Sequence, residues 1–305
     1  MSADASAPLI KNEDSPRGFA FALTAYLLWG FLPIYMKAVA HISPAEVIAH
    51  RILWSLPLAG IVLLVLGRTQ DIAAALRSPR MLAMAAMTAT LITVNWGTYV
   101  WAIGAGHSLD AAMGYFINPL FSIFLGAVLL KEKLQPMQIA AICLAGLAVV
   151  VLAFDSGGIP WVALTLAISW GFYALFRKTL PLGPNQGFFL EVLILSLPAL
   201  LYILYLEFVS GEGHLYRTGL ADTALLLGCG LITAVPLMIY ANGAKLLKLS
   251  TIGIMQYIAP TIIFIIAIFG FGEKLDTARM IAFPLIWAGL FFYSWSMLKV
   301  SRGRM

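Results

Sequence analysis

Long apolar runs follow one another along almost the whole chain, and each is about as long as a membrane-spanning helix. About 20 apolar residues in a helix cross a hydrocarbon core of about 30 Å. Lipid offers no hydrogen-bonding partner to a free backbone, so each run is expected to be helical. The runs predict ten spans, at residues 18–37, 46–66, 81–102, 111–130, 136–154, 160–176, 187–208, 221–243, 251–271 and 278–298. The connections are short, so no separate soluble domain is expected.

An internal repeat divides these spans into two sets of five. Residues 23–37 (LTAYLLWGFLPIYMK) return 141 positions later as residues 164–178 (LTLAISWGFYALFRK). The same offset carries Pro119 onto Pro260, and residues 132–134 (EKL) onto residues 273–275 (EKL). Matches of Trp, Pro and Glu-Lys at one offset are not expected between unrelated apolar helices, so the chain holds two copies of one unit.

Five spans in each copy make the second copy cross the membrane upside down relative to the first. Inverted repeats are typical of transporters, with the site at the repeat interface. The sequence therefore predicts an all-α membrane protein with ten transmembrane helices, as two inverted five-helix repeats around a central cavity. The predicted parts are a cytoplasmic tail (1–17), the first repeat (18–154), the second, inverted repeat (159–298) and a second cytoplasmic tail (299–305).

Composition and charge agree with this assignment. The chain is 61% hydrophobic and 11% charged, whereas a soluble domain is about 25% charged. The net charge of +5 does not indicate nucleic-acid binding, because the basic residues sit mainly in short loops and at the termini. One side of the predicted bundle carries most of them, and the other carries only Lys37, Arg51, Arg217, Lys274 and Arg279. The positive-inside rule then predicts a multi-pass protein of the inner membrane with both termini in the cytoplasm.

Motifs for ATP, metal or covalent chemistry are missing from the sequence. The P-loop pattern G-x-x-x-x-G-K-[ST] does not occur, so direct drive by ATP is not expected. No cluster of His, Cys and Glu has metal-ligand spacing, and no Ser/His/Asp set indicates a hydrolase. We therefore expect no cofactor, no metal and no enzymatic activity.

Polar and aromatic residues recur on single faces of several spans. Asn95 and Tyr99 share a face of the third span, and Tyr115 and Asn118 share a face of the fourth. Such stripes are expected to line one cavity between the halves; the alternative is that they hydrogen-bond neighbouring helices. The candidate substrate-binding residues are Tyr26, Trp29, Asn95, Tyr99, Tyr115, Asn118, Trp170, Tyr240, Gln256 and Tyr257. Packing or interfacial anchoring is expected instead for Trp96, Trp101 and Trp161.

Three ionisable residues inside the spans are candidates for charge or proton sensing: His50, Arg51 and Glu191. A charge at the centre of a span costs about 2.5–3.5 kcal/mol on insertion scales, so it is expected to be paired or hydrated. Glu46 lies one turn from His50 and is a candidate partner for it. We hypothesise that one of the three polarises the cavity or senses protons. The alternative places Glu46, His50 and Arg51 at the interface, with the arginine reaching the headgroups.

Pro119 and Pro260 are repeat mates inside spans, each beside a polar or aromatic stripe. A proline removes one helical hydrogen bond and permits a kink. They are candidate hinges for rocking one half against the other, and a static bend is the alternative.

Several short motifs resemble those of a known family. They are residues 114–119 (GYFINP), 249–260 (LSTIGIMQYIAP), 50–55 (HRILWS) and the pair Asn95-Trp96. In these motifs the chain resembles the RarD branch of the EamA family, in the drug/metabolite transporter superfamily. The resemblance covers residues 18–298 and implies ten helices, inverted repeats, a central cavity and export or exchange of small metabolites. Two departures are Gly104-Ala105-Gly106 in place of an Asn-rich turn, and Ala259 in place of Gly.

The predicted function is secondary transport by alternating access. The expected cargo is small and amphipathic, with neutral or aromatic amino acids favoured, because Asn, Gln and Tyr suit polar ends and aromatic faces suit apolar ends. The alternatives are a drug-efflux permease of the chloramphenicol type, an integral membrane lipid enzyme, and a structural membrane protein that moves nothing. Expected partners are a small-molecule substrate and the lipid bilayer, without nucleic acid. The sequence leaves proton coupling and homo-oligomerisation open.

Overall fold

Helices make up the bundle in the computed structural model, which describes residues 15–129, 131, 134–155, 159–244, 246–247 and 249–302. In the first half they are α1 (Pro16–Ala38), α2 (Pro44–Val65), α3 (Gln70–Leu76), α4 (Pro79–Gly104), α5 (Ser108–Leu129) and α6 (Pro136–Asp155). In the second half they are α7 (Trp161–Thr179), α8 (Pro184–Tyr205), η1 (Leu206–Ser210), α9 (Leu220–Ala244), α10 (Leu249–Met255), α11 (Ile258–Ile265), η2 (Ile266–Gly270) and α12 (Thr277–Arg302).

Eight segments within the described part are long and apolar enough to cross a membrane, and two shorter apolar ones, Trp161–Arg177 and Ile258–Gly270, bring the total to ten. The prediction of an all-α membrane protein with ten transmembrane helices is thus confirmed. The short helix α3 was not predicted; it lies in the connection between the second and third spans.

Three helices of the first repeat begin two residues earlier than predicted, each at a Ser-Pro pair. The hydroxyls of Ser15, Ser43 and Ser78 accept hydrogen bonds from the amides three residues on, at 2.9, 3.2 and 3.4 Å. The proline after each serine occupies the first helical position, where no amide donor is needed. These caps fix the helix starts just outside the apolar runs.

The ninth predicted span (251–271) is not one continuous helix. It is interrupted at Gln256 and Tyr257, between α10 and α11. Pro260 has no N–H to donate to the Gln256 carbonyl one turn back, so one hydrogen bond of the helical ladder is missing there. Its repeat mate Pro119 has the same deficiency, yet α5 runs unbroken past it. The two hinge candidates therefore differ in their local structure.

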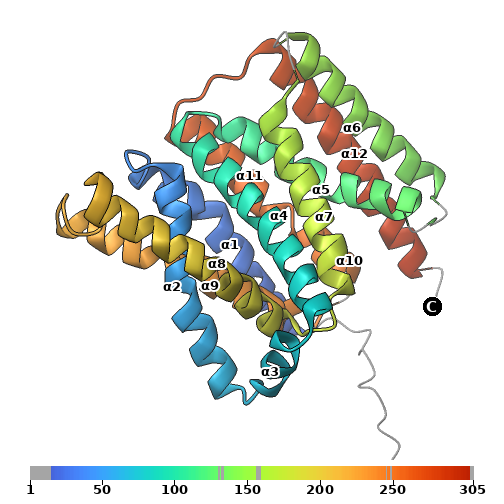
Figure 1. Ribbon diagram of the computed structural model, residues 1–305. Helices are drawn as coiled ribbons and strands as arrows, with labels where there is room; N and C mark the ends of the chain where they lie inside the picture. Colours follow the sequence, from blue (N-terminus) through green and yellow to red (C-terminus); the bar gives the residue numbers. More distant parts are fainter. Residues whose placement is uncertain are drawn as a thin grey trace, which may run out of the picture.

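The packing of the helices follows the repeat. α1 contacts α9 and α11, and its counterpart α7 makes the equivalent contacts with α4 and α5. The last helices of the repeats, α6 and α12, lie side by side at one edge of the bundle (Figure 1). α2 pairs in the same way with its counterpart α8. These pairs join one repeat to the other as a pseudo-two-fold axis requires, and the prediction of two inverted five-helix repeats is confirmed.

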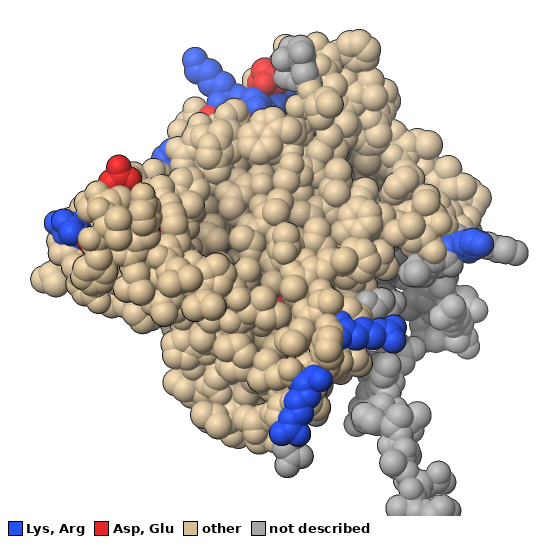
Figure 2. Space-filling model, viewed as in Figure 1, with Lys and Arg blue, Asp and Glu red and all other residues tan. Residues whose placement is uncertain are grey.

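The outer surface of the helices is apolar. Large side chains such as Phe154, Phe208 and Phe269 are exposed to at least 75%. In Figure 2 most of the charged residues lie towards the margins of the face in view, and a broad, largely uncharged region lies between them. Such a surface is unfavourable in water but matches the hydrocarbon of a bilayer.

Candidate substrate-binding cavity

A cavity opens between helices of both repeats, with about 950 Å³ of unfilled space counted out to its mouth. The lining residues that the sequence predicted are Tyr26, Trp29, Asn95, Tyr99, Tyr115, Asn118, Trp170, Tyr240 and Gln256. The structure brings these nine together, and their role in binding stays a prediction.

Tyr257 is the one predicted binding residue that the structure does not bring to the cavity. Its ring packs instead against the apolar cluster formed around α5, α6 and α12. Successive residues in a helix or helical turn point about 100° apart, so Gln256 can face the cavity while its neighbour faces away.

Repeat mates from the two halves line this cavity together. Trp29 and Trp170 both line it, and so do Tyr99 and Tyr240. The symmetry is broken at Asn118, because the mate of Asn118 is Ala259. The cavity therefore has a polar amide on the side of the first repeat where the second repeat offers only a methyl group.

Arg51 lies in this cavity and is almost fully buried, with 3% of its surface exposed. Its Nε donates a hydrogen bond to Thr233 Oγ1 at 2.9 Å, which ties α2 to α9. Its guanidinium carbon lies 4.7 Å from the centroid of the Trp96 ring, a cation–π contact. The alternative in which Arg51 reaches the headgroups is therefore wrong.

Trp96 was expected to pack or to anchor the helix at the interface, but it lines the cavity. It lies three positions before Tyr99, so helical spacing alone places both residues on one face of α4. This spacing was the signal that could have identified Trp96 as a cavity residue.

Asn95 both lines the cavity and binds neighbouring helices. Its Nδ2 donates to the Leu166 carbonyl and to Ser169 Oγ, each at 3.0 Å. Its Oδ1 accepts a hydrogen bond from Tyr115 OH at 3.2 Å. Asn95 therefore holds α4 against α7 and α5, which is the helix-bonding role offered above as the alternative.

Three aromatic rings form a wall of the cavity, hereafter the aromatic wall: Tyr26 and Trp29 on α1, and Tyr240 on α9. The ring centroids lie 5.4–5.7 Å apart in edge-on or tilted arrangements. Rings that support one another in this way offer a rigid apolar surface.

Neither His50 nor Glu191 is among the residues that line the cavity. His50 is fully buried, and its Nδ1 accepts a hydrogen bond from Trp54 Nε1 at 2.9 Å. Glu191 lies 3.3 Å from Arg177 Nε and accepts a hydrogen bond from Tyr173 OH at 3.2 Å. Of the three candidate charges, Arg51 alone is in a position to polarise the cavity directly.

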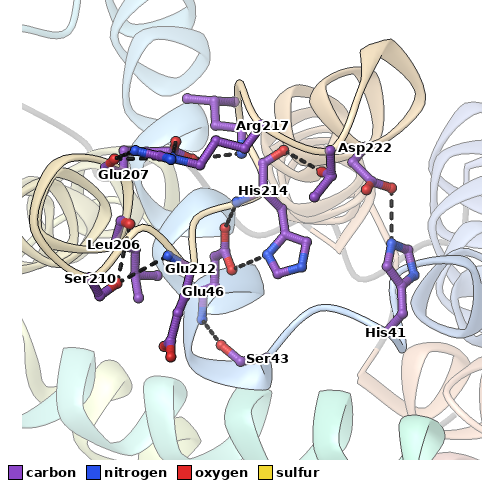
Figure 3. A network of polar contacts seen from close by, with 12 residues as sticks. His41, Ser43, Glu46, Leu206, Glu207, Ser210, Glu212, His214, Arg217 and Asp222 are labelled. Atoms are coloured by element: carbon purple, nitrogen blue, oxygen red, sulfur yellow. Dashed lines mark hydrogen bonds and ion pairs between the residues drawn. The ribbon is translucent and has the colours of Figure 1, made fainter.

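Glu46 pairs with His214, and not with the candidate partner His50. The Glu46 carboxylate accepts from the His214 amide at 2.8 Å and lies 2.9 Å from His214 Nδ1 (Figure 3). The connection between η1 and α9, which carries His214, folds over the beginning of α2. Nearby, Glu207 accepts from the Leu215 amide at 2.7 Å. These contacts form one polar network at the end of the bundle.

A second polar cluster joins the beginning of α5 to the beginning of α12. The Glu273 carboxylate accepts from the amides of Ser108 and Leu109 at 2.8 and 2.9 Å. Arg279 forms an ion pair with Asp110 at 2.9 Å. In the topology predicted from loop charge, both polar clusters lie at the outer ends of the helices. Within the described part of the chain, no group of three or more His, Cys, Asp or Glu side chains is placed to hold a metal ion.

The sequence of the chain is similar to those of proteins named as transporters. The model of the EamA-like transporter family matches residues 16–154 and 158–295, one match in each half. A protein named RarD from Streptomyces exfoliatus is 38% identical over 294 residues, which cover 96% of this chain and 93% of that protein. An uncharacterized transporter of Pseudomonas aeruginosa is 40% identical over 280 residues, which cover 91% and 93%.

Two further comparisons are with a more distant relative and with a solved structure. A protein named chloramphenicol-sensitive protein RarD, from Pseudomonas aeruginosa, is 28% identical over 292 residues, which cover 94% of this chain and 97% of that protein. A solved structure titled "Crystal structure of protein" superposes with a TM-score of 0.59 over 93% of this chain and 98% of its own. At 19% identity, that likeness shows the fold alone.

Proposed function

The chain belongs to the EamA-like transporter family and to its RarD branch, and we propose that it is a secondary transporter that exports or exchanges small amphipathic metabolites. The favoured cargo is a neutral or aromatic amino acid. The observation that carries this proposal is the cavity between the repeats, in which polar groups on α4 and α5 share one space with the aromatic wall. Such a lining suits a molecule with one polar and one apolar end.

Alternating access is the proposed mechanism. The cavity lies between two inverted halves, so rocking of one half against the other exposes the same residues first to one side and then to the other. Pro119 and Pro260 are the proposed hinges. The helix is interrupted before Pro260, so we expect the second repeat to bend more easily at its hinge than the first. We place both termini in the cytoplasm and the protein in the inner membrane. The proposed tails are 1–17 and 299–305, and the proposed repeats are 18–154 and 159–298.

The test is counterflow into liposomes that contain the purified protein. Unlabelled phenylalanine, tryptophan, methionine or threonine is loaded inside, and uptake of the same labelled amino acid is measured. We expect transient accumulation that depends on the protein. Correctly folded protein that gives no counterflow with any amino acid or with a wider metabolite panel would contradict the proposal.

Drug efflux is the second candidate function, because one relative is named for sensitivity to chloramphenicol. Labelled chloramphenicol in the same liposomes separates the two. Counterflow of chloramphenicol without counterflow of amino acids would favour the drug permease.

A further inference from the structure

Arg51 has no acidic partner in the described part of the chain. It is the only charged residue among the described residues that line the cavity. Among the described residues, its one side-chain hydrogen bond goes to the neutral Thr233, and its Nη1 is buried without a partner. A buried charge is normally paired, because removing it from water costs several kcal/mol. The cavity thus holds an uncompensated positive charge before any ligand enters.

Two further lining residues have buried polar atoms without partners. They are the hydroxyl of Tyr99, which is 2% exposed, and Oδ1 of Asn118, which is 6% exposed. Tyr99 lies one turn beyond Trp96, the residue that supports the Arg51 guanidinium. In the cavity lining, the buried polar atoms without partners are therefore two groups that can donate, on Arg51 and Tyr99, and one that can only accept, on Asn118. Native structures leave few such groups, so a ligand that satisfies them is expected.

We infer that the transported molecule carries a carboxylate, which binds Arg51 and the Tyr99 hydroxyl. This inference rests on the proposed function and narrows its substrate class to aromatic or long apolar α-amino acids. A protonated amino group is the natural partner for Asn118 Oδ1, because that oxygen can only accept. The apolar side chain lies on the aromatic wall. Compounds whose only charge is positive are disfavoured by Arg51.

The spacing along α9 gives the length of such a molecule. Thr233, which holds Arg51, and Tyr240, which belongs to the aromatic wall, are seven positions apart on this helix. Seven residues rise about 10 Å and make about two turns, so both residues face the same side. A substrate has to reach from the charged end to the wall, which favours ligands of the length of phenylalanine or tryptophan over acetate or glycine.

The test uses matched ligands that differ in the carboxylate. Thermal unfolding of the purified protein is measured with L-phenylalanine, L-phenylalaninamide and 2-phenylethylamine, because a ligand that binds only the folded state raises its stability. We expect phenylalanine to bind at least about tenfold more tightly than the amide or the amine, since a hydrogen bond to a charged group is lost with the carboxylate.

Variants at Arg51 assign this preference to the guanidinium. Arg51→Met should abolish the difference between acid and amide, and Arg51→Lys should keep part of it. The matched control is Arg68→Met, which removes a positive charge from an exposed site outside the cavity and should leave the preference intact. If Arg51→Met does not fold, the ligand series on the wild-type protein and on Arg51→Lys still tests whether the carboxylate binds Arg51.

The outcomes separate the inference from the function it rests on. Equal binding of acid, amide and amine, a preference that survives Arg51→Met, or folded wild-type protein that binds none of the three would overturn the inference. Amino-acid counterflow with no dependence on Arg51 overturns the inference and leaves the transporter standing. Arg51-dependent binding of phenylalanine without any counterflow supports the inference about the carboxylate and contradicts the proposed transport.

Discussion

Gly171 on α7 packs so closely against Phe121 on α5 that a Cβ at position 171 would lie 2.5 Å from Phe121 Cδ1. Its repeat mate Gly30 on α1 faces Ile262 on α11 in the same way, with 2.7 Å to the nearest side-chain atom. Positions 121 and 262 are themselves repeat mates. Small residues let membrane helices approach closely. The two glycines therefore bring together two helix pairs that each join one repeat to the other.

Substitution of Gly171 by alanine is expected to lower the stability of the folded protein by about 1–3 kcal/mol, because the added methyl overpacks the contact with Phe121. Thermal unfolding in detergent measures the loss. Gly97→Ala is the matched control, since a Cβ at Gly97 has no heavy atom within 4 Å. Equal melting temperatures for the two variants would show that the close approach at Gly171 does not matter.

The architecture was predictable from the sequence because lipid leaves the backbone few choices. Apolar runs of spanning length have to form helices. The repeat that carries Trp29 onto Trp170 holds five spans in each copy, so the second copy is inverted relative to the first. The same repeat also locates much of the cavity, since mates on equivalent helices meet at the pseudo-two-fold axis. Predicted helix starts were two residues late because the Ser-Pro caps lie outside the apolar runs, where hydropathy carries no signal.

The polar pairs at the helix ends were not predictable in this way. Glu46 had a plausible partner one turn away in His50, whereas its actual partner, His214, is 168 positions distant. Such pairs depend on how a connection folds back over the bundle, and a helical pattern cannot report that. The orientation of Tyr257 was missed for a related reason, since the interruption between α10 and α11 decides which of two neighbours faces the cavity.

The carboxylate of Glu46 should contribute more to stability than the imidazole of His214. Glu46 accepts both from the His214 side chain and from its backbone amide, and His214→Ala leaves the backbone bond in place. Glu46→Ala is therefore expected to cost more than His214→Ala, with each hydrogen bond worth about 1–3 kcal/mol. A double-mutant cycle measured by thermal unfolding gives the side-chain part. A larger loss for His214→Ala would contradict this assignment.

Glu273 caps α5 from the other repeat, so its loss should also destabilise the fold. Its carboxylate satisfies two amides at a helix N-terminus and lies at the positive end of the helix dipole. We expect Glu273→Ala to cost about 1–2 kcal/mol in thermal unfolding. The control is Glu212→Ala, which removes an exposed carboxylate from the connection before α9. A comparable loss of stability in Glu212→Ala would show that the effect does not depend on the capping of α5 by Glu273.

The aromatic wall should determine affinity for the apolar end of the substrate. Trp29→Ala removes the largest ring of the wall and is expected to raise the KM for phenylalanine about tenfold or more, from lost apolar burial and ring contact. Tyr240→Phe keeps its ring and should change the KM little. Counterflow kinetics measure both, with Trp101→Ala as a control outside the cavity. An unchanged KM for Trp29→Ala at normal expression would remove the wall from the binding site.

Glu191 is expected to stabilise the protein and to leave substrate affinity unchanged. It lies outside the cavity lining and is paired with Arg177, which also donates to the carbonyls of Gly183 and Pro184. In Glu191→Gln the Arg177 guanidinium keeps its hydrogen bonds to those carbonyls. The expected loss of stability is therefore about 1–3 kcal/mol, less than for a buried charge that is left without any partner. Tyr173→Phe removes one hydrogen bond from Glu191 and keeps the ion pair, so it should cost less. An altered KM or an altered pH dependence of counterflow in Glu191→Gln, with Tyr173→Phe unaffected, would instead assign Glu191 the proton-sensing role proposed from its place in the repeat.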